Sequence, residues 1–266
     1  MLDRFNRQIS YLRISVTDRC NLRCIYCMPE QGIPLMSHDE ILRYEEIIAV
    51  VKEAAKLGIS KVRITGGEPL VRKGVTGLVE GISKTGLISD LALTTNGILL
   101  EAYAGALAEA GLHRVNISLD SIDPDRYQVL TRGGELAQVL SGIRAAKAAG
   151  LHPVRINCVV MHSRDEEDAA GVSNFCKEHD LEVRFIRRMD LENGCFSVVE
   201  GGTGGDCTAC NRLRLTANGF IKPCLFNNMG FSIREMGIRE ALLAAIEMKP
   251  EKGSVNTVNQ FNNIGG

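Results

Sequence analysis

The 266-residue chain lacks three features that would define its partners. Its formal net charge is -1 at pH 7, with 31 Lys and Arg against 32 Asp and Glu, so it has no basic field for long nucleic acids. It has no apolar run of about eighteen residues and no secretory leader, and we therefore expect a cytoplasmic protein without a membrane span. An anionic ligand would have to meet arginines that the fold gathers locally.

Disulfide bonds are not expected either, although the chain contains nine cysteines. The number is odd, the chain is long and six of the nine fall in two tight groups, whereas disulfide frameworks are typical of small secreted proteins. Cys158 and Cys176 lie in apolar patterns that fit small buried side chains, and we assign no role to Cys195, which lies in a loop-like stretch. The two groups are therefore candidate metal ligands.

The first group, Cys20, Cys24 and Cys27, has a C-x3-C-x2-C spacing and follows a strand-like run. Three thiolates leave one iron of a [4Fe–4S] cluster free to chelate a small molecule. The alternative is a zinc knuckle, which normally closes its tetrahedron with a fourth Cys or His, and only His38 lies nearby. The spacing favours the iron–sulfur cluster.

The second group, Cys207, Cys210 and Cys224, spans a hairpin signal at Asn218-Gly219. A zinc ribbon has a similar pattern but needs a fourth ligand, and none of the five histidines follows Cys207. We therefore favour a second [4Fe–4S] cluster, again with one open iron.

Short β-branched runs alternate with helical patterns and predict a parallel sheet built from βαβ units. The expected strands are 12–16, 61–65, 91–95, 114–119, 154–161 and 183–186. Six units are too few for a closed eight-stranded barrel, so we expect an α/β fold with a partial (β/α)6 TIM-like barrel and a small C-terminal extension; an open doubly wound sheet is the second choice. Ligands bind where such strands end, and the first cysteine group, the turn 66–69 and the segments 94–97 and 118–120 all follow strands.

Helix boundaries and divisions of the chain can also be predicted. We expect one helix with Ser37 as its N-cap and Glu40 completing a capping box, ending at Gly58, and a last helix over 233–248. The strand–helix rhythm breaks after residue 189. We therefore divide the chain into a barrel (1–189), a short linker (190–206) and a C-terminal cysteine region (207–266).

Several arginines lie inside the strand-like runs. They are Arg13, Arg63, Arg155 and Arg184, with Arg212 and Arg214 two apart on one face of a further expected strand. On an edge strand such charges would only deter aggregation. Buried inside a barrel without partners they would be costly, so several that face one lumen predict a polyanionic ligand there.

These motifs together resemble one family. The matching stretches are Leu12 to Cys20, Cys27-Met-Pro, Arg63 to Leu70, Thr94 to Gly97, Asn116 to Ser121, Arg184-Phe-Ile, Cys210 to Thr216 and the terminal Ile-Gly-Gly. They are similar to the MoaA family, the radical-SAM GTP 3',8-cyclases of molybdenum cofactor biosynthesis, over nearly the whole chain. The resemblance implies two [4Fe–4S] clusters, S-adenosylmethionine as the source of a 5'-deoxyadenosyl radical, and conversion of GTP to 3',8-cyclo-7,8-dihydro-GTP.

The resemblance also implies a role for each matching position. Cys20, Cys24 and Cys27 would hold the cluster that binds S-adenosylmethionine, with Tyr26, Gly66, Gly67, Glu68, Ser118 and Met189 near that cofactor. Cys207, Cys210 and Cys224 would hold the second cluster, whose open iron takes the guanine of GTP. The nucleotide would be surrounded by Arg13, Arg63, Thr94, Arg155, Arg212 and Arg214. The residues implied in catalysis are Arg13, Arg212 and Arg214, together with Gly265 and Gly266, which would reach into the active site.

Three departures from the family flank the substrate side. Only 17 residues separate Met189 from Cys207, where the family has several dozen; Arg187 replaces a glutamate; and Arg155 replaces a lysine. The alternative function is a MoaA-like radical-SAM maturase that acts on a pterin cofactor or a peptide, and a structural zinc-binding protein is the remaining one. The resemblance further implies an electron donor such as ferredoxin or flavodoxin, and it is compatible with a homodimer.

Overall fold

A computed structural model describes residues 1–258 and 261–264 of the chain. In these residues one sheet has nine strands in the order β6-β5-β4-β3-β2-β1-β7-β8-β9. The strands are β1 Tyr11–Ser15, β2 Lys61–Thr65, β3 Asp90–Thr95, β4 Arg114–Ser118, β5 Arg155–Val160, β6 Glu182–Arg187, β7 Arg212–Leu215, β8 Phe220–Lys222 and β9 Phe231–Ser232. The six predicted strands are therefore confirmed, within a residue or two at their ends.

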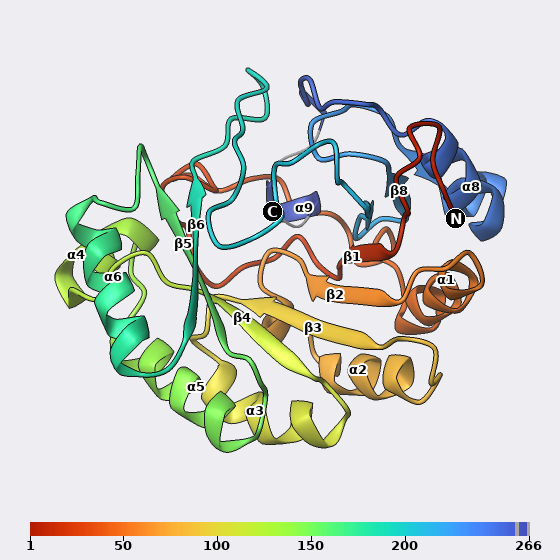
Figure 1. The fold of residues 1–266 in the computed structure, drawn as a ribbon. Helices are drawn as coiled ribbons and strands as arrows, with labels where there is room; N and C mark the ends of the chain where they lie inside the picture. Colours follow the sequence, from red (N-terminus) through yellow and green to blue (C-terminus); the bar gives the residue numbers. More distant parts are fainter. Residues whose placement is uncertain (259–260, 265–266) are drawn as a thin grey trace.

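Strands β1 to β6 pair in parallel with their neighbours, and the helices between them cover the outer face of the curved sheet (Figure 1). These helices are α1 Tyr44–Lys56, α2 Val75–Ser83, α3 Leu100–Glu109, α4 Pro124–Thr131, α5 Leu136–Ala148 and α6 Glu167–Glu178, with a short 3-10 turn, η1, at Pro69–Val71. Two helices, α4 and α5, join β4 to β5. This is the partial (β/α)6 barrel that the sequence predicts.

The C-terminal region continues the same sheet. Strand β7 pairs in parallel with β1, and β8 turns back antiparallel to β7 across the predicted Asn218-Gly219 turn, where Gly219 has φ 91°. The chain then forms α7 Ile233–Met236, α8 Ile238–Glu247 and α9 Phe261–Ile264. The cysteine region is thus joined to the barrel edge by main-chain hydrogen bonds, while the three-part division of the chain stays a prediction.

The predicted start of the first helix is wrong. The amide and hydroxyl of Ser37 both donate to Glu40 Oε2 at 2.8 Å, but they only close a turn. Helix α1 begins later, with Arg43 as N-cap and Glu46 completing the capping box. The amide of Leu42 donates to the Ala217 carbonyl at 2.8 Å, so the β7–β8 hairpin holds this segment extended until α1 begins.

The last predicted helix is broken. It starts at Ile233 as expected, but Gly237, with φ 89°, separates α7 from α8. A glycine adopts this left-handed conformation without the penalty that a Cβ brings, and the helical hydrogen-bond ladder cannot continue through it. The end of α1 is as predicted, because Gly58 follows it with φ 95°.

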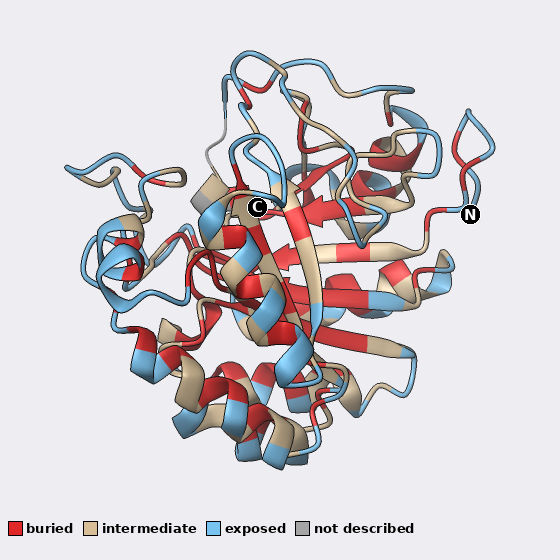
Figure 2. Cartoon of the chain, turned by 60° about the vertical axis from the view of Figure 1, so that its left-hand side comes forward, coloured by how far each residue is buried: buried red, intermediate tan, exposed pale blue. Residues whose placement is uncertain are grey.

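The main core lies between the sheet and the outer helices, and the strands are buried along most of their length (Figure 2). Alternate residues of a strand point to opposite faces, so Leu12 and Ile14 of β1 pack toward the helices while Arg13 faces the interior. A smaller core of Leu191, Leu225, Phe226 and Ile264 joins the linker to α9. No helix in the described part of the chain is long and apolar enough to cross a membrane.

Candidate active site

The inside of the barrel contains two adjoining cavities. The first cavity, of about 190 Å³, lies at the carboxyl ends of the strands and is lined by Cys20, Cys24 and Cys27. The second, which we call the arginine cavity, measures about 450 Å³ and is lined by Cys207, Cys210 and Cys224 together with arginines of β1, β2 and β4 to β7. The two predicted cysteine groups therefore open onto neighbouring spaces, although only the first lies at the predicted carboxyl edge.

The first cysteine group lies in the loop after β1. Burial, followed by the negative charges of Asp120 and the neighbouring thiols, raises the pKa of Cys24 to about 12, and burial raises the pKa of Cys27 to about 12 as well. All three thiols line the same cavity, and Cys20 and Cys27 both contribute to the raised pKa of Cys24. Free thiols here stay protonated at neutral pH, so a group that binds them as thiolates must displace the protons.

The turn after β2 packs directly on the chain that leads into Cys20. The amide of Gly67 donates to the Thr17 carbonyl at 2.7 Å, and the amide of Glu68 donates to the Arg19 carbonyl at 2.8 Å. A Cβ on Gly67 would lie 2.7 Å from the carbonyl carbon of Arg19 and 2.9 Å from the Asp18 oxygen. The glycine is required because no side chain fits between these two backbones.

Glu68 fixes the turn after β2 through hydrogen bonds to its carboxylate. Its carboxylate accepts hydrogen bonds from Thr95 Oγ1 at 2.8 Å, the Asn96 amide at 2.7 Å and the Leu70 amide at 3.0 Å. Burial raises its pKa to about 7 even though these bonds favour the charged form. Both oxygens are engaged by the protein, so Glu68 lines the first cavity but holds the ends of β2 and β3 together.

The other predicted cofactor residues also line the first cavity. Tyr26 donates its hydroxyl to Asp120 Oδ2 at 2.6 Å, and Asp120 Oδ1 accepts from the Val159 amide at 2.7 Å, which fixes the cysteine loop to the ends of β4 and β5. Ser118 and Met189 line the same space. Thr94, predicted beside the nucleotide, lies here instead, and its buried hydroxyl has no hydrogen-bond partner among the described residues. An unsatisfied polar group of this kind fits a site that receives a polar ligand.

The arginines of the second cavity form a row across three strands. Arg13 is paired in register with Arg63 on one side and with Arg214 on the other, so the three side chains share one face of the sheet. Arg212 and Arg63 both place their guanidinium groups over the Tyr11 ring, at 5.9 and 5.5 Å from its centroid. The cavity lining contains seven arginines and two lysines against two aspartates.

The buried arginines of the arginine cavity repel one another, which costs folding free energy. Burial, followed by the charge of Arg214, lowers the pKa of Arg13 well below its usual value, and burial together with Arg212 lowers the pKa of Arg214 to about 10. The Nε atom of Arg63 is buried without a hydrogen-bond partner in the described part of the chain. Arg155, by contrast, forms an ion pair with Glu182. A polyanion would relieve this repulsion.

The second cysteine group borders the arginine cavity on the side of β7 and β8. Burial raises the pKa of Cys224, the charge of Cys210 contributes to this rise, and Lys249 acts on the pKa of both thiols. Burial works to raise the pKa of Cys210, but the Lys249 charge is the largest of the effects that bring it below its usual value. Among the described residues, no three Cys, His, Asp or Glu side chains converge as ligands of one metal ion. The donor set, three thiolates without histidine, is one that iron–sulfur clusters use.

Three residues line both cavities: Asn157, Ile186 and Met189. The two cysteine groups therefore face a common interior, separated by the side chains of β5 and β6. The sequence identified Met189 but missed Asn157, which is two residues beyond Arg155 on the same face of β5. It also missed Arg114, which pairs with Asp90. Lys249 was missed because a lysine just after a helix usually interacts with the helix C-terminus at the protein surface. Gly265 and Gly266 lie outside the described residues.

Comparisons with known proteins agree with this architecture. Residues 14–176 match the family model of the radical SAM superfamily. Among solved structures, anSMEcpe with bound AdoMet has a TM-score of 0.64 at 17% identity over 91% of this chain and 81% of its own. Streptococcus suis SuiB bound to S-adenosylmethionine has a TM-score of 0.65 at 16% identity over 88% and 63%. These likenesses show the fold.

Curated relatives match nearly end to end. A GTP 3',8-cyclase of Petrotoga mobilis is 43% identical over 94% of this chain and 94% of its own, and one of Alkaliphilus metalliredigens is 42% identical over 95% and 94%. A third, of Thermodesulfovibrio yellowstonii, is 39% identical over both whole chains. That alignment spans 322 positions, so this 266-residue chain lacks a segment that the relative has. The chain belongs to the radical-SAM superfamily and, within it, to the family of GTP 3',8-cyclases.

Proposed function

We propose that this chain converts GTP to 3',8-cyclo-7,8-dihydro-GTP in molybdenum cofactor biosynthesis, with one [4Fe–4S] cluster in the first cavity and a second in the arginine cavity. The observation that carries the proposal is the pair of cysteine triads on adjoining cavities, one of them lined by seven arginines. When bound, the first cluster and S-adenosylmethionine would supply a 5'-deoxyadenosyl radical. Removal of the ribose C3' hydrogen of GTP would let C3' bond to guanine C8, and one electron from the external donor with one proton would complete the dihydro product.

The residues of the first cavity bind and orient the cofactor. Cys20, Cys24 and Cys27 would be the thiolate ligands of the cluster. The Gly66-Gly67 turn would present main-chain groups to S-adenosylmethionine, since no side chain shields it there, with Glu68 as its brace. Tyr26, Ser118 and Met189 would line the rest of the cofactor site, with Tyr26 held by Asp120.

The residues of the arginine cavity bind and orient the substrate. The row of Arg63, Arg13 and Arg214, flanked by Arg155 and Arg212, would hold the triphosphate through paired hydrogen bonds. Cys207, Cys210 and Cys224 would bind the second cluster, whose open iron would take the guanine. We place Thr94 between cofactor and ribose, because it lines the first cavity. A low-potential donor such as ferredoxin or flavodoxin, a cytoplasmic location, and entry of Gly265 and Gly266 into the site belong to the same proposal.

The test is a turnover assay on anaerobically reconstituted protein with S-adenosylmethionine, dithionite and GTP. We expect 5'-deoxyadenosine and loss of GTP in step with each other. C207A should lose GTP conversion, whereas C195S, which changes an exposed cysteine outside both triads, should retain it. Formation of 5'-deoxyadenosine without consumption of GTP would reject GTP as the substrate.

One observation favours a second candidate, a MoaA-like radical-SAM maturase acting on a pterin cofactor or a peptide. The chain lacks a segment that the relative of Thermodesulfovibrio yellowstonii has, and Arg187 and the linker residues 190–192 and 194–197 line a further open pocket of about 870 Å³ beside Cys27. A larger substrate would use that space. The same assay separates the two candidates, because only the cyclase consumes GTP as 5'-deoxyadenosine forms. A broad absorption band near ~400 nm separates either from a zinc protein.

A further inference from the structure

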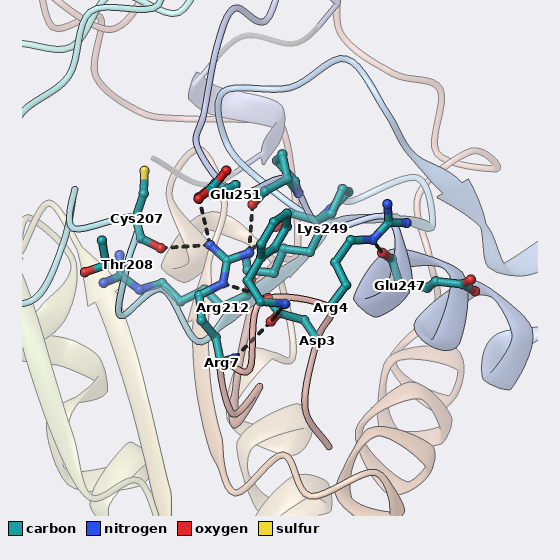
Figure 3. Close-up of polar contacts among 12 residues, drawn as sticks. Asp3, Arg4, Arg7, Cys207, Thr208, Arg212, Glu247, Lys249 and Glu251 are labelled. Atoms are coloured by element: carbon teal, nitrogen blue, oxygen red, sulfur yellow. Dashed lines mark hydrogen bonds and ion pairs between the residues drawn. The ribbon is translucent and has the colours of Figure 1, made fainter.

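Two buried cations hold the segment that carries the second cysteine group (Figure 3). Arg7 belongs to the loop before β1, and Lys249 follows the end of α8. Arg7 is 7% exposed and Lys249 is 2% exposed. Neither lies on a strand of the barrel, and neither has a place in the proposed binding of GTP.

Lys249 connects two of the three cysteine ligands. Its ammonium donates to the Arg212 carbonyl at 2.7 Å and to the Pro223 carbonyl at 2.6 Å, and its charge lowers the pKa of the Cys210 thiol. Pro223 immediately precedes Cys224, and Arg212 opens the strand that follows Cys210. Two of the three N–H groups of the ammonium are therefore bound to carbonyl groups of this segment.

Arg7 fixes the third ligand and the segment beyond Lys249. Its Nη1 donates to the Cys207 carbonyl at 2.8 Å and to the Glu251 carbonyl at 2.9 Å, while Nη2 donates to the Pro250 carbonyl at 2.7 Å. Its Nε bonds Asp3 Oδ2 at 2.7 Å, and the Asp3 side chain is fully buried. One guanidinium thereby joins the N-terminal loop, the cysteine loop and the chain after α8.

Lys249 forms no ion pair with a carboxylate in the described part of the chain; its ammonium is held by the two carbonyls and is influenced by the nearby thiol of Cys210. Burying an ammonium is costly unless a negative group balances it. The anionic group that this position can reach is the thiolate of Cys210, or a thiolate-ligated cluster bound there. Hydrogen bonds to the ligating sulfurs and the local charge set the reduction potential of such a cluster.

We propose that Lys249 is a positioning residue for the second cluster. Its ammonium holds Cys210 and the peptide before Cys224 in the ligating arrangement and places a positive charge beside the cluster, while Arg7 locks Cys207 and the Lys249 segment together. The inference rests on the second cluster of the proposed function. Loss of the charge should make that cluster harder to reduce, and loss of either cation should make it easier to remove.

The experiment isolates the second cluster in the full chain by means of the C20A/C24A/C27A variant. In this background we compare Lys249→Met, Lys249→Arg, Arg7→Met and Arg4→Met. Arg4 is the matched control: it also ties the N-terminal loop to the end of α8, through Glu247 O at 2.6 Å, but contacts no residue of the cysteine loop. Redox titration followed by EPR gives the reduction potential, and the rate of iron loss to a chelator gives the strength of binding.

We expect K249M to lower the one-electron reduction equilibrium constant by about tenfold, which is about 59 mV, and to lose iron several-fold faster. K249R should keep a potential near that of the parent, because the charge remains. R7M should lose iron faster, and R4M should match the parent in both measurements.

The outcomes separate the inference from the proposed function. If the C20A/C24A/C27A variant holds no iron, the second cluster is absent, and both the proposed second cluster and the role of Lys249 are refuted. If it holds about four irons per chain, the second cluster is supported. In that case, a parental potential and a parental iron-loss rate in K249M refute the role of Lys249 alone. Should K249M fail to fold by circular dichroism, K249R and K249Q decide: a lowered potential in K249Q but not in K249R supports the role, and equal potentials refute it.

Discussion

Gly67→Ala tests the packing that positions the first cysteine group. The new Cβ would lie 2.7 Å from the Arg19 carbonyl carbon and 2.9 Å from the Asp18 oxygen, closer than side-chain carbons approach backbone atoms. Because both neighbours are backbone, neither can rotate away. The turn and the chain before Cys20 must separate, which weakens the 2.7 Å bond from the Gly67 amide and the 2.8 Å bond from the Glu68 amide.

The cost of such overpacking is about 1–3 kcal/mol. Each kcal/mol lowers the Tm of a chain of this size by roughly 2–4 °C, so a fall of several degrees is expected in the metal-free protein. Gly105→Ala is the matched control, because nothing lies within 4 Å of a Cβ built on this glycine of α3. Alanine is the better helix former, and G105A should stabilise the chain by about 0.5–1 kcal/mol.

Urea unfolding followed by circular dichroism measures the stability, and iron content after anaerobic reconstitution measures the integrity of the first cysteine site. We expect G67A to unfold at lower urea and to bind less iron, with G105A at or above wild type in both. A G67A protein with the wild-type midpoint and full iron content would show that the contact between the two turns does not fix the position of Cys20.

Three other substitutions test the site and the second core. Arg63→Met removes a buried guanidinium whose Nε has no partner in the described residues, so we expect unchanged or slightly higher stability in urea. Its affinity for GTP, measured by calorimetry, should be at least about tenfold lower, because hydrogen bonds to charged groups contribute about 1.5–3 kcal/mol. Lower stability without weaker binding would contradict this expectation. Burial raises the pKa of Asp120 from 3.8 to about 6, so the native state favours the protonated form, and the stability that this contributes is complete below pH 3.8 and lost as the pH rises through 6. Urea unfolding of metal-free protein between pH 3.8 and about 6 should show this loss of stability, at most about 3 kcal/mol, in the wild type but not in Asp120→Asn. Identical pH profiles of the two proteins would refute the raised pKa of Asp120. Phe226→Ala removes a buried aromatic side chain from the small core and should lower its stability by about 3–5 kcal/mol. The linker 190–206 should then be cleaved earlier by a protease. Wild-type resistance to the protease would mean that this core does not hold the linker.

Local patterns were sufficient to predict the repeating part of the fold. A short β-branched run followed by a helical pattern recurs in the chain, and each run is a strand of the sheet. The Asn218-Gly219 turn and the glycines that end helices were found for the same reason, since a residue with positive φ is required at one position whatever surrounds it. The cysteine spacings likewise predicted the two groups of ligands.

Predictions failed where a distant segment decided the local structure. Ser37 and Glu40 form the bonds of a capping box, yet the hydrogen bond from Leu42 to Ala217 holds the next residues out of a helix. A sequence window around Ser37 does not contain Ala217.

The sequence by itself determined which chemical groups the protein has and which strands carry them, because thiolate spacing, strand periodicity and turn residues act over a few positions. Only the tertiary structure decided that Arg63, Arg13 and Arg214 lie in one row, since strand register across β2, β1 and β7 depends on the packing of the whole sheet. It alone also placed Lys249 beside Cys210, because a buried cation between two remote segments leaves no mark in the sequence around it.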